Sequence, residues 1–131
     1  MRELIRTTKA LADENRIRIL GALIDRELCV CQLIELLGFA PSTVSKHLSI
    51  LRNARLIESR KQGRWMYYRL ARADATVQTD AAIGWVLQSF KGCRQYLEDS
   101  RRLAEILQID PEVLCSRQAG SGVCDRRNSG K

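Results

Sequence analysis

Residues 27–51, "ELCVCQLIELLGFAPSTVSKHLSIL", hold two apolar patterns separated by a short turn. The first pattern has the three-four spacing of one buried helix face and consists of Val30, Leu33, Ile34 and Leu37. Gly38 follows where helices commonly end in a left-handed residue. Pro41 suits the first turn of a second helix, because its missing N–H would be unpaired there anyway. The stretch therefore predicts a helix over about residues 30–37, a short turn and another helix, which is the helix-turn-helix pattern.

The second helix of this pattern has one apolar and one polar face. Val44, Leu48 and Leu51 form the predicted buried stripe. The opposite side carries short hydroxyls and cations at Ser42, Ser45, Lys46, Ser49 and Arg52. Such side chains hydrogen-bond base edges and phosphates without steric bulk, as a major groove requires. The alternative reading is an ordinary surface helix.

The flanking segments extend the pattern to a winged helix. A helix over about residues 2–12 precedes a second one, for which Asp13 offers an N-cap. After the helix-turn-helix, the apolar period becomes strand-like on both sides of "RKQGR", which predicts a hairpin with Gly63 in its turn. The expected fold is mainly α with a small β-hairpin wing.

The segment from Asp74 onward reads as a long helix. Its apolar stripe consists of Ile83, Val86, Leu87, Phe90, Cys93 and Leu97. A stripe of this length on a small domain needs a partner surface. The final residues are polar and Gly/Ser-rich without periodicity. We therefore expect one domain over residues 1–110 and a flexible tail over residues 111–131.

The net charge of +7 is concentrated in one segment. Residues 41–72 carry eight Lys/Arg and one Asp/Glu, whereas the six basic and six acidic residues of 1–40 cancel, as do the eight and eight of 73–131. A localised basic block is typical of phosphate binding. This distribution favours a nucleic-acid partner over a solvated surface of mixed charge.

Other features restrict the class of protein. No run of 18 apolar residues and no signal peptide is present, so we expect a cytoplasmic protein without a membrane partner. No Gly-rich phosphate loop, Ser/His/Asp set or paired carboxylates are recognisable, so we expect no enzyme and no catalytic cofactor. Structural disulfides are rare in a reducing compartment, which leaves metal binding, redox sensing or burial for the five cysteines, Cys29, Cys31, Cys93, Cys115 and Cys124.

The segments "KALADENRIRILGAL", "STVSKHLSILRNARLI" and "RKQGRWMYYRL" together resemble the ArsR/SmtB family of bacterial winged-helix repressors. "ELCVC" is similar to the metalloid box of the arsenic-responsive branch. The resemblance implies a homodimer through the first and last helices, residues 2–12 and 74 onward. It also implies a repressor that binds operator DNA and leaves it when trivalent arsenic or antimony binds cysteine thiolates.

The resemblance places DNA contacts on the second helix of the motif and on the wing. Ser42, Thr43, Ser45 and Lys46 would read bases, and Arg52, Lys61 and Arg64 would contact phosphates and the adjacent groove. His47, the only histidine, is expected on the DNA side or in helix packing. Ala40 departs from the family, which usually has a polar cap there.

The expected metalloid ligands are Cys29, Cys31 and a third thiol. The position that often carries the third cysteine is Ile34 here, so Cys93 is the predicted third ligand, with core packing as its alternative and with Cys115 and Cys124 as other candidates. Trivalent arsenic is a soft centre and binds thiolates in preference to harder ligands. A helix N-terminus stabilises the negative charge of a thiolate, so it favours the deprotonated form of a cysteine placed there.

Residues i and i+2 of a regular helix point about 200° apart, so Cys29 and Cys31 converge only if Cys29 stays outside the helix or the first turn unwinds. We expect such a distortion to pass to the DNA-reading helix. Two alternatives use the same scaffold: a thiol-redox sensor and a sensor of cadmium, lead or zinc.

Overall fold

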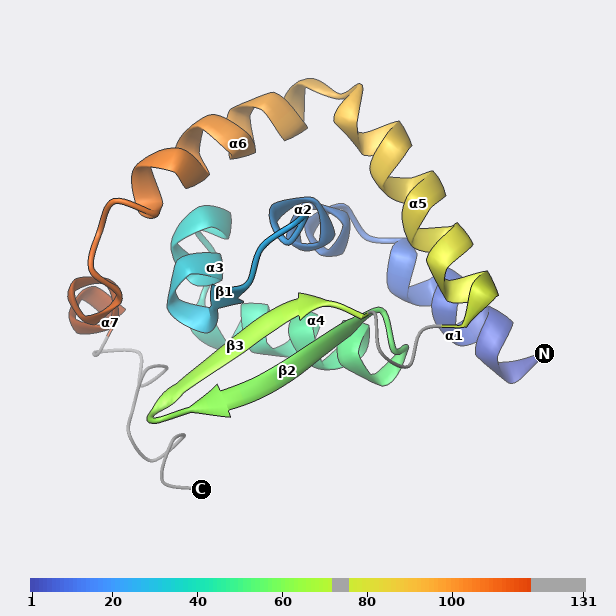
Figure 1. The fold of residues 1–131 in the computed structure, drawn as a ribbon, viewed down its shortest axis with the longest axis horizontal. Helices are drawn as coiled ribbons and strands as arrows, with labels where there is room; N and C mark the ends of the chain where they lie inside the picture. Colours follow the sequence, from blue (N-terminus) through green and yellow to red (C-terminus); the bar gives the residue numbers. More distant parts are fainter. Residues whose placement is uncertain (72–75, 119–131) are drawn as a thin grey trace.

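The computed structural model describes residues 1–71 and 76–118, which form seven helices and three short strands (Figure 1). The elements are α1 (Arg2–Leu11), α2 (Glu14–Ala22), β1 (Leu28–Cys29), α3 (Val30–Leu37), α4 (Pro41–Asn53), β2 (Ile57–Gln62), β3 (Trp65–Leu70), α5 (Val77–Lys91), α6 (Arg94–Ile106) and α7 (Pro111–Gln118). In Figure 1, α5 and α6 form an arc around α2 and α3, and α4 lies with the β2–β3 hairpin on the opposite side. This is the expected mainly α fold with a small wing.

The helix-turn-helix forms as the sequence pattern predicts. Gly38 ends α3 with a φ of 75°, in the left-handed region that glycine adopts without strain. Pro41 begins α4. Upstream, the Asp13 carboxylate accepts the N–H groups of Asn15 at 2.8 Å and Arg16 at 3.3 Å, which confirms the predicted cap of α2. The apolar faces of α3 and α4 meet in the core, where Leu33, Val44, Leu48 and Leu51 are buried.

The wing contains one strand more than expected. β2 and β3 pair antiparallel around Gly63, whose φ is 63°, so the predicted hairpin and its turn are confirmed. β1 joins the other edge of β3, with Leu28 opposite Tyr68 and Cys29 opposite Tyr67. A strand of two residues has no period to detect, so only the available edge of β3 reveals it.

The predicted long C-terminal helix is interrupted. α5 ends at Lys91, and α6 begins at Arg94 with Cys93 as its N-cap. The interruption changes the direction of the chain, so the predicted stripe does not continue: Cys93 is exposed and Leu97 is 59% exposed. The prediction that Cys93 lies on a buried stripe is therefore wrong.

The segment predicted to be a flexible tail, residues 111–131, begins with a helix. Residues 111–118 form α7, in which Leu114 is fully buried. The Asp110 carboxylate accepts the N–H of Glu112 at 2.9 Å and so supports the first turn. One buried leucine in eight residues produces no apolar stripe, which is why the sequence pattern missed this helix. Residues 119–131, with Cys124, lie outside the described residues.

Candidate nucleic-acid interface and thiol site

The exposed face of α4 carries the side chains predicted to read DNA. Ser42, Thr43, Ser45 and Lys46 are all exposed, while Val44 between them is fully buried. α4 is held from behind by its own apolar stripe and by its contacts with α2, α3 and β2. The helix therefore presents short hydroxyls and a cation outward on a rigid support.

His47 does not share the exposure of its neighbours. Its Nδ1 lies 3.1 Å from a guanidinium nitrogen of Arg16, which also donates through Nε to the carbonyl of Ala10 at 2.8 Å. Because arginine can only donate, His47 Nδ1 is placed to accept this hydrogen bond. This contact ties α4 to the junction of α1 and α2 and favours the helix-packing role.

The cations of the wing are partly neutralised by acids from elsewhere in the chain. Arg60 donates two hydrogen bonds of 2.7 Å to Glu27 and lies over the Tyr67 ring, and it holds the pKa of the Glu27 carboxyl below its usual range. Arg64 pairs with Glu112 of α7, and Arg69 pairs with Glu58 at 3.0 Å. In the folded protein, residues 41–72 therefore present less positive charge than their sequence suggests. Glu27 and Glu112, which lie outside this segment in the chain, pair with two of its arginines.

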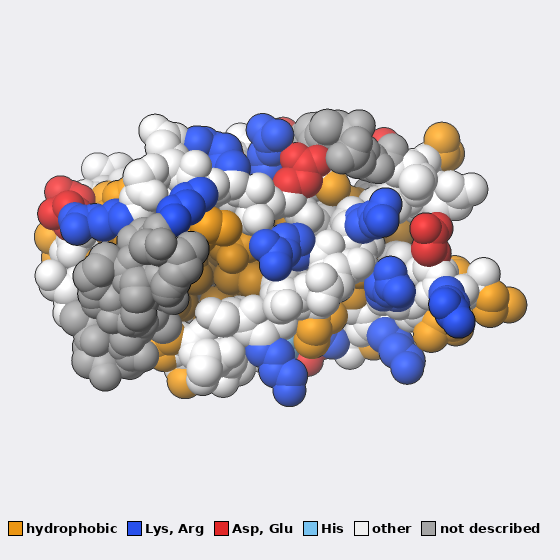
Figure 2. Space-filling view, turned by 90° about the horizontal axis from the view of Figure 1, so that it is seen from below, with side chains coloured by type: hydrophobic (Ala, Val, Ile, Leu, Met, Phe, Trp, Pro, Cys, Tyr) orange, Lys and Arg blue, Asp and Glu red, His pale blue; other side chains and the backbone are white. Residues whose placement is uncertain are grey.

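Cations nevertheless remain distributed over the face formed by α4 and the wing, as Figure 2 shows in blue. Lys46, Arg52, Arg55 and Lys61 are all exposed on these segments. Arg52 also donates to the Ser59 hydroxyl at 3.3 Å, which joins the end of α4 to β2. Helix and wing thus present one surface with positive charge at several points.

Cys29 and Cys31 lie at the start of α3 and are both fully buried. Cys29 is the N-cap, with an extended backbone (φ −85°, ψ 163°), so it stays outside the helix as convergence with Cys31 requires. Its backbone N–H donates to Gln32 Oε1 at 2.9 Å in a reciprocal capping box. The geometric objection to a shared site therefore does not apply to this backbone.

Burial controls the protonation of Cys29. It raises the pKa of the thiol above its ordinary value of 9.0, because the thiolate would lose its water. The N–H groups of Gln32 and Cys31 oppose this shift without cancelling it, and the electrostatic influence of the Cys115 side chain adds a small rise. The expected activation by the helix N-terminus exists but is outweighed, so Cys29 is a protonated thiol at neutral pH.

The two candidate third ligands within the described residues differ in their surroundings. Cys93 is exposed, with its Sγ 3.7 Å from the Ser89 carbonyl. Cys115 is half-buried on α7 and packs against the core cluster that contains Cys29 and Cys31. Cys31 is not a free thiol in this structure. Within residues 1–71 and 76–118 no three His, Cys, Asp or Glu side chains are grouped as a ready-made metal site.

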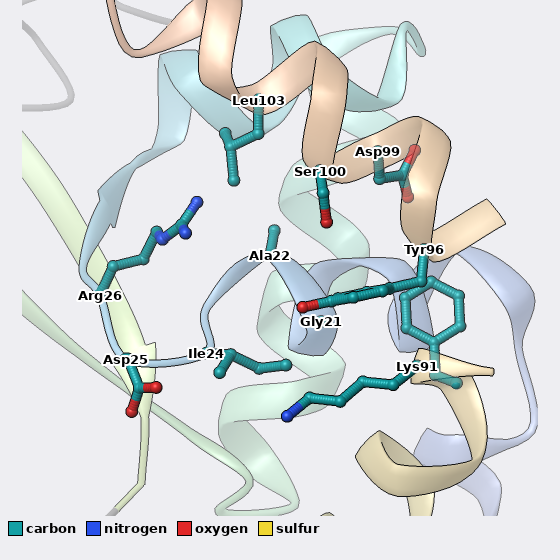
Figure 3. Close-up of a pocket in the computed structure, with 11 residues that line it drawn as sticks. Gly21, Ala22, Ile24, Asp25, Arg26, Lys91, Tyr96, Asp99, Ser100 and Leu103 are labelled. Atoms are coloured by element: carbon teal, nitrogen blue, oxygen red, sulfur yellow. The ribbon is translucent and has the colours of Figure 1, made fainter. Parts of the chain in front are cut away.

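A cavity of about 240 Å³ lies beside the junction between α5 and α6 (Figure 3). It lies between the end of α2 and this junction, and a Cβ on Gly21 would lie 2.5 Å from Phe90 Cε2, so only glycine permits the close packing here. Lys91, Tyr96 and Ser100 are among its lining residues, which include no cysteine or histidine. The cavity next to Cys93 therefore does not match the thiolate preference of a soft metalloid.

The structure defines a winged helix-turn-helix protein, and comparisons with known proteins identify its family. Residues 13–59 match the family model described as "Bacterial regulatory protein, arsR family". HlyU from Vibrio cholerae is 30% identical and superposes with a TM-score of 0.58, over 68% of this chain and 92% of that one. The chain belongs to the ArsR family.

Curated relatives match over the same part of the chain. A "Transcriptional repressor SmtB homolog" from Synechocystis is 48% identical over 47% of this chain and 47% of its own length. The "Arsenical resistance operon repressor" of Escherichia coli is 44% identical over 51% of this chain and 58% of its own. The matches thus span about half the length of these relatives.

No described helix of this chain is long and apolar enough to cross a membrane.

Proposed function

We propose that this chain is a cytoplasmic transcriptional repressor that binds operator DNA as a homodimer and dissociates when trivalent arsenic or antimony binds Cys29 and Cys31. It would act as a regulator rather than an enzyme, with DNA binding and dimerisation in residues 1–110. The observation that carries the proposal is the exposed hydroxyl and lysine face of α4, supported by a buried apolar stripe. The names of relatives in the same family, a repressor of an arsenical resistance operon among them, support this function.

The DNA-binding part of the proposal assigns α4 to the major groove and the wing to the flanking backbone. Ser42, Thr43, Ser45 and Lys46 would contact base edges. Arg52, Lys61 and Arg64 would contact phosphates, and Arg64 would have to exchange its pairing with Glu112 for DNA. His47 would position α4 through Arg16 and would also lie on the DNA side of this helix.

Replacing Lys46 tests this assignment. A labelled duplex covering the DNA upstream of the protein's own gene is titrated with reduced protein, and fluorescence anisotropy reports binding. Lys46→Ala should weaken binding about tenfold. Lys91→Ala removes the same charge from the α5–α6 side and should leave binding within about twofold. Equal affinities for the wild type and Lys46→Ala at physiological salt would contradict the assignment.

The homodimer is proposed from exposed apolar side chains on α1 and α5. Leu4 is 58% exposed, Val77 81% and Trp85 71%. α1 and the start of α5 lie close enough to line one small cavity through Glu3 and Thr79, so these helices form a continuous side of the molecule. Exposed apolar surface of this kind marks an interface. Trp85→Asp should shift the sedimentation coefficient to that of a monomer, whereas Phe39→Asp, between α3 and α4, should leave the dimer intact.

The metalloid part of the proposal depends on two sulfurs at the start of α3. With both cysteines reduced, arsenite should release the wild type from DNA, while Cys29→Ser and Cys31→Ser should remain bound. Titration with cadmium and zinc in place of arsenite separates the metalloid from the divalent-metal alternative. Release by cadmium alone would replace arsenic as the inducer without changing the DNA-binding assignment.

A thiol-redox sensor is a second candidate, because Cys31 is not a free thiol in this structure. In that case mild peroxide, rather than arsenite, would release the protein from DNA. Non-reducing mass spectrometry before and after peroxide would identify the cysteines that become linked. Peroxide that changes neither the mass nor DNA binding would eliminate this candidate.

A further inference from the structure

We infer that Cys115 on α7, and not Cys93, supplies the third sulfur of the metalloid site, within the same subunit as Cys29 and Cys31. The inference rests on the proposed function and adds the helix that the sequence pattern missed. It makes α7 part of the sensor.

Two contacts fix α7 against the start of α3. Leu114 is fully buried, and Gln118 Nε2 donates to the Cys31 carbonyl at 3.1 Å inside the protein. Cys115 and Gln118 are three residues apart on one helix, so their side chains lie on the same side of α7. Because Gln118 reaches the backbone of Cys31, that side faces the first turn of α3.

The surroundings of Cys115 agree with this placement. Cys115 packs against the core cluster to which both Cys29 and Cys31 belong. Thiols from α3, β1 and α7 therefore lie in one part of the molecule.

Cys93 lies at the other end of α6. Arg102 of α6 donates to the Glu35 carbonyl of α3 at 3.1 Å, which shows where α6 passes α3. Cys93 precedes Arg102 by nine positions, about 13 Å along a helix axis. Its side chain is exposed rather than directed into the core. The sulfur of Cys93 thus has no short path to Cys29.

The chemistry needs no oxidant or reductant once the cysteines are thiols. Arsenous acid carries three hydroxyl groups on trivalent arsenic. Each thiol forms one As–S bond, and its proton leaves with a hydroxyl group as water, so three thiols release three waters and arsenic stays trivalent. Because no preassembled trio exists among the described residues, the sulfurs must move together on binding.

Such a movement would reach the wing directly. Cys29 lies in β1, opposite Tyr67 of β3, so pulling Cys29 toward α7 strains the edge of the wing sheet. Glu112 of α7 also pairs with Arg64 of the wing. Binding at α7 would therefore change the position of both the wing and the start of α3.

The test measures arsenic binding directly, apart from DNA. Full-length protein is reduced with a phosphine, separated from it under argon, and titrated with arsenite, while ultraviolet absorbance follows As–S bonds and mass spectrometry counts bound arsenic. Cys115→Ser should weaken binding at least about tenfold, because one chelating arm is lost. Cys93→Ser is the matched control and should change binding less than about twofold.

A second measurement avoids the variants. Arsenite is added to the reduced wild type, and exposed thiols are labelled with a maleimide and located by peptide mass. Cys29 and Cys31 are buried and should stay unlabelled with or without arsenite, whereas arsenite should protect the half-buried Cys115 and leave Cys93 reactive. Protection of Cys93 instead of Cys115, or a normal arsenic affinity of Cys115→Ser, would overturn the inference.

Two further outcomes separate the inference from the proposed function. If Cys29→Ser abolishes arsenic binding and Cys115→Ser does not, the thiol pair stands and the inference fails. If the reduced wild type binds no arsenic, both fail. A mixture of Cys29→Ser and Cys115→Ser chains should bind poorly, because neither subunit holds a complete set; recovery of binding in the mixture would show a site between subunits and overturn the inference.

Discussion

The beginning of α6 and the helix that follows its end are fixed to the core in different ways. Near its start, Asp99 accepts hydrogen bonds from Arg18 of α2 at 2.9 and 3.0 Å, and both side chains are largely buried. Beyond its end, α7 is fixed by Leu114 and by the neutral hydrogen bond of Gln118. An ion pair fixes α6, which Cys93 precedes, whereas apolar packing fixes α7, which carries Cys115. Both cysteines are candidate third ligands from the sequence alone.

The largest expected effect comes from breaking the ion pair. Asp99→Ala leaves the Arg18 charge largely buried without its partner, which should cost about 3 kcal/mol or more of unfolding free energy. Urea denaturation followed by circular dichroism measures the change. Glu98→Ala, an exposed neighbour, should stay within about 0.5 kcal/mol of the wild type. A similar loss in both variants would show that the effect does not come from the ion pair between Asp99 and Arg18.

The apolar anchor of α7 should rank second. Leu114→Ala removes a fully buried side chain, and we expect a loss of about 2–3 kcal/mol by the same measurement. Val113 is 46% exposed, so Val113→Ala serves as the control with little effect. Unlike Asp99→Ala, Leu114→Ala should also weaken arsenite binding, because it releases Cys115. Unchanged arsenite affinity would separate α7 from the sensor.

The hydrogen bond between Gln118 and Cys31 should contribute less. Gln118→Ala leaves the Cys31 carbonyl without this donor, for an expected cost of about 1 kcal/mol. Hydrogen exchange at the start of α3 would increase more than exchange in α4. Ser116→Ala, at an exposed position of the same helix, should change neither the stability nor the exchange.

The smallest effect is a pH dependence from Cys29. Its folded-state pKa is raised above 9.0, so the unfolded chain loses the thiol proton first and stability falls as pH rises above 9.0. At that pH the loss should be only a few tenths of a kcal/mol. Cys29→Ser should flatten the curve there. Burial also raises the pKa of Tyr68, so Tyr68→Phe distinguishes its contribution at higher pH.

The elements that sequence reasoning predicted correctly share a local cause. The period of α3, the left-handed end at Gly38, the cap at Asp13 and the turn at Gly63 each depend on residues a few positions apart. The exposed face of α4 follows from the same periodicity. Local spacing was sufficient for these features, because the backbone conformations involved are preferred by the residues themselves.

The failures share a different cause. β1 needs the edge of β3, and α7 needs the surface of α3, so neither is visible in its own few residues. The basic block lost part of its charge to Glu27 and Glu112, which are distant in sequence. Cys93 was placed on a stripe that the break before α6 redirects. Each of these outcomes depends on contacts between distant segments.

The amino-acid sequence alone was enough for the winged helix-turn-helix, the exposed polar face of α4 and the cysteine pair at the start of α3. Periodicity, capping and turn residues act locally, and these features follow from them. The burial of Cys29, the contact of His47 with Arg16 and the choice between Cys93 and Cys115 required the folded chain. The physical reason is that burial, ion pairing and the proximity of thiols depend on distances between segments that are far apart in the sequence. The packing of α6 and α7 around α2 and α3 sets these distances.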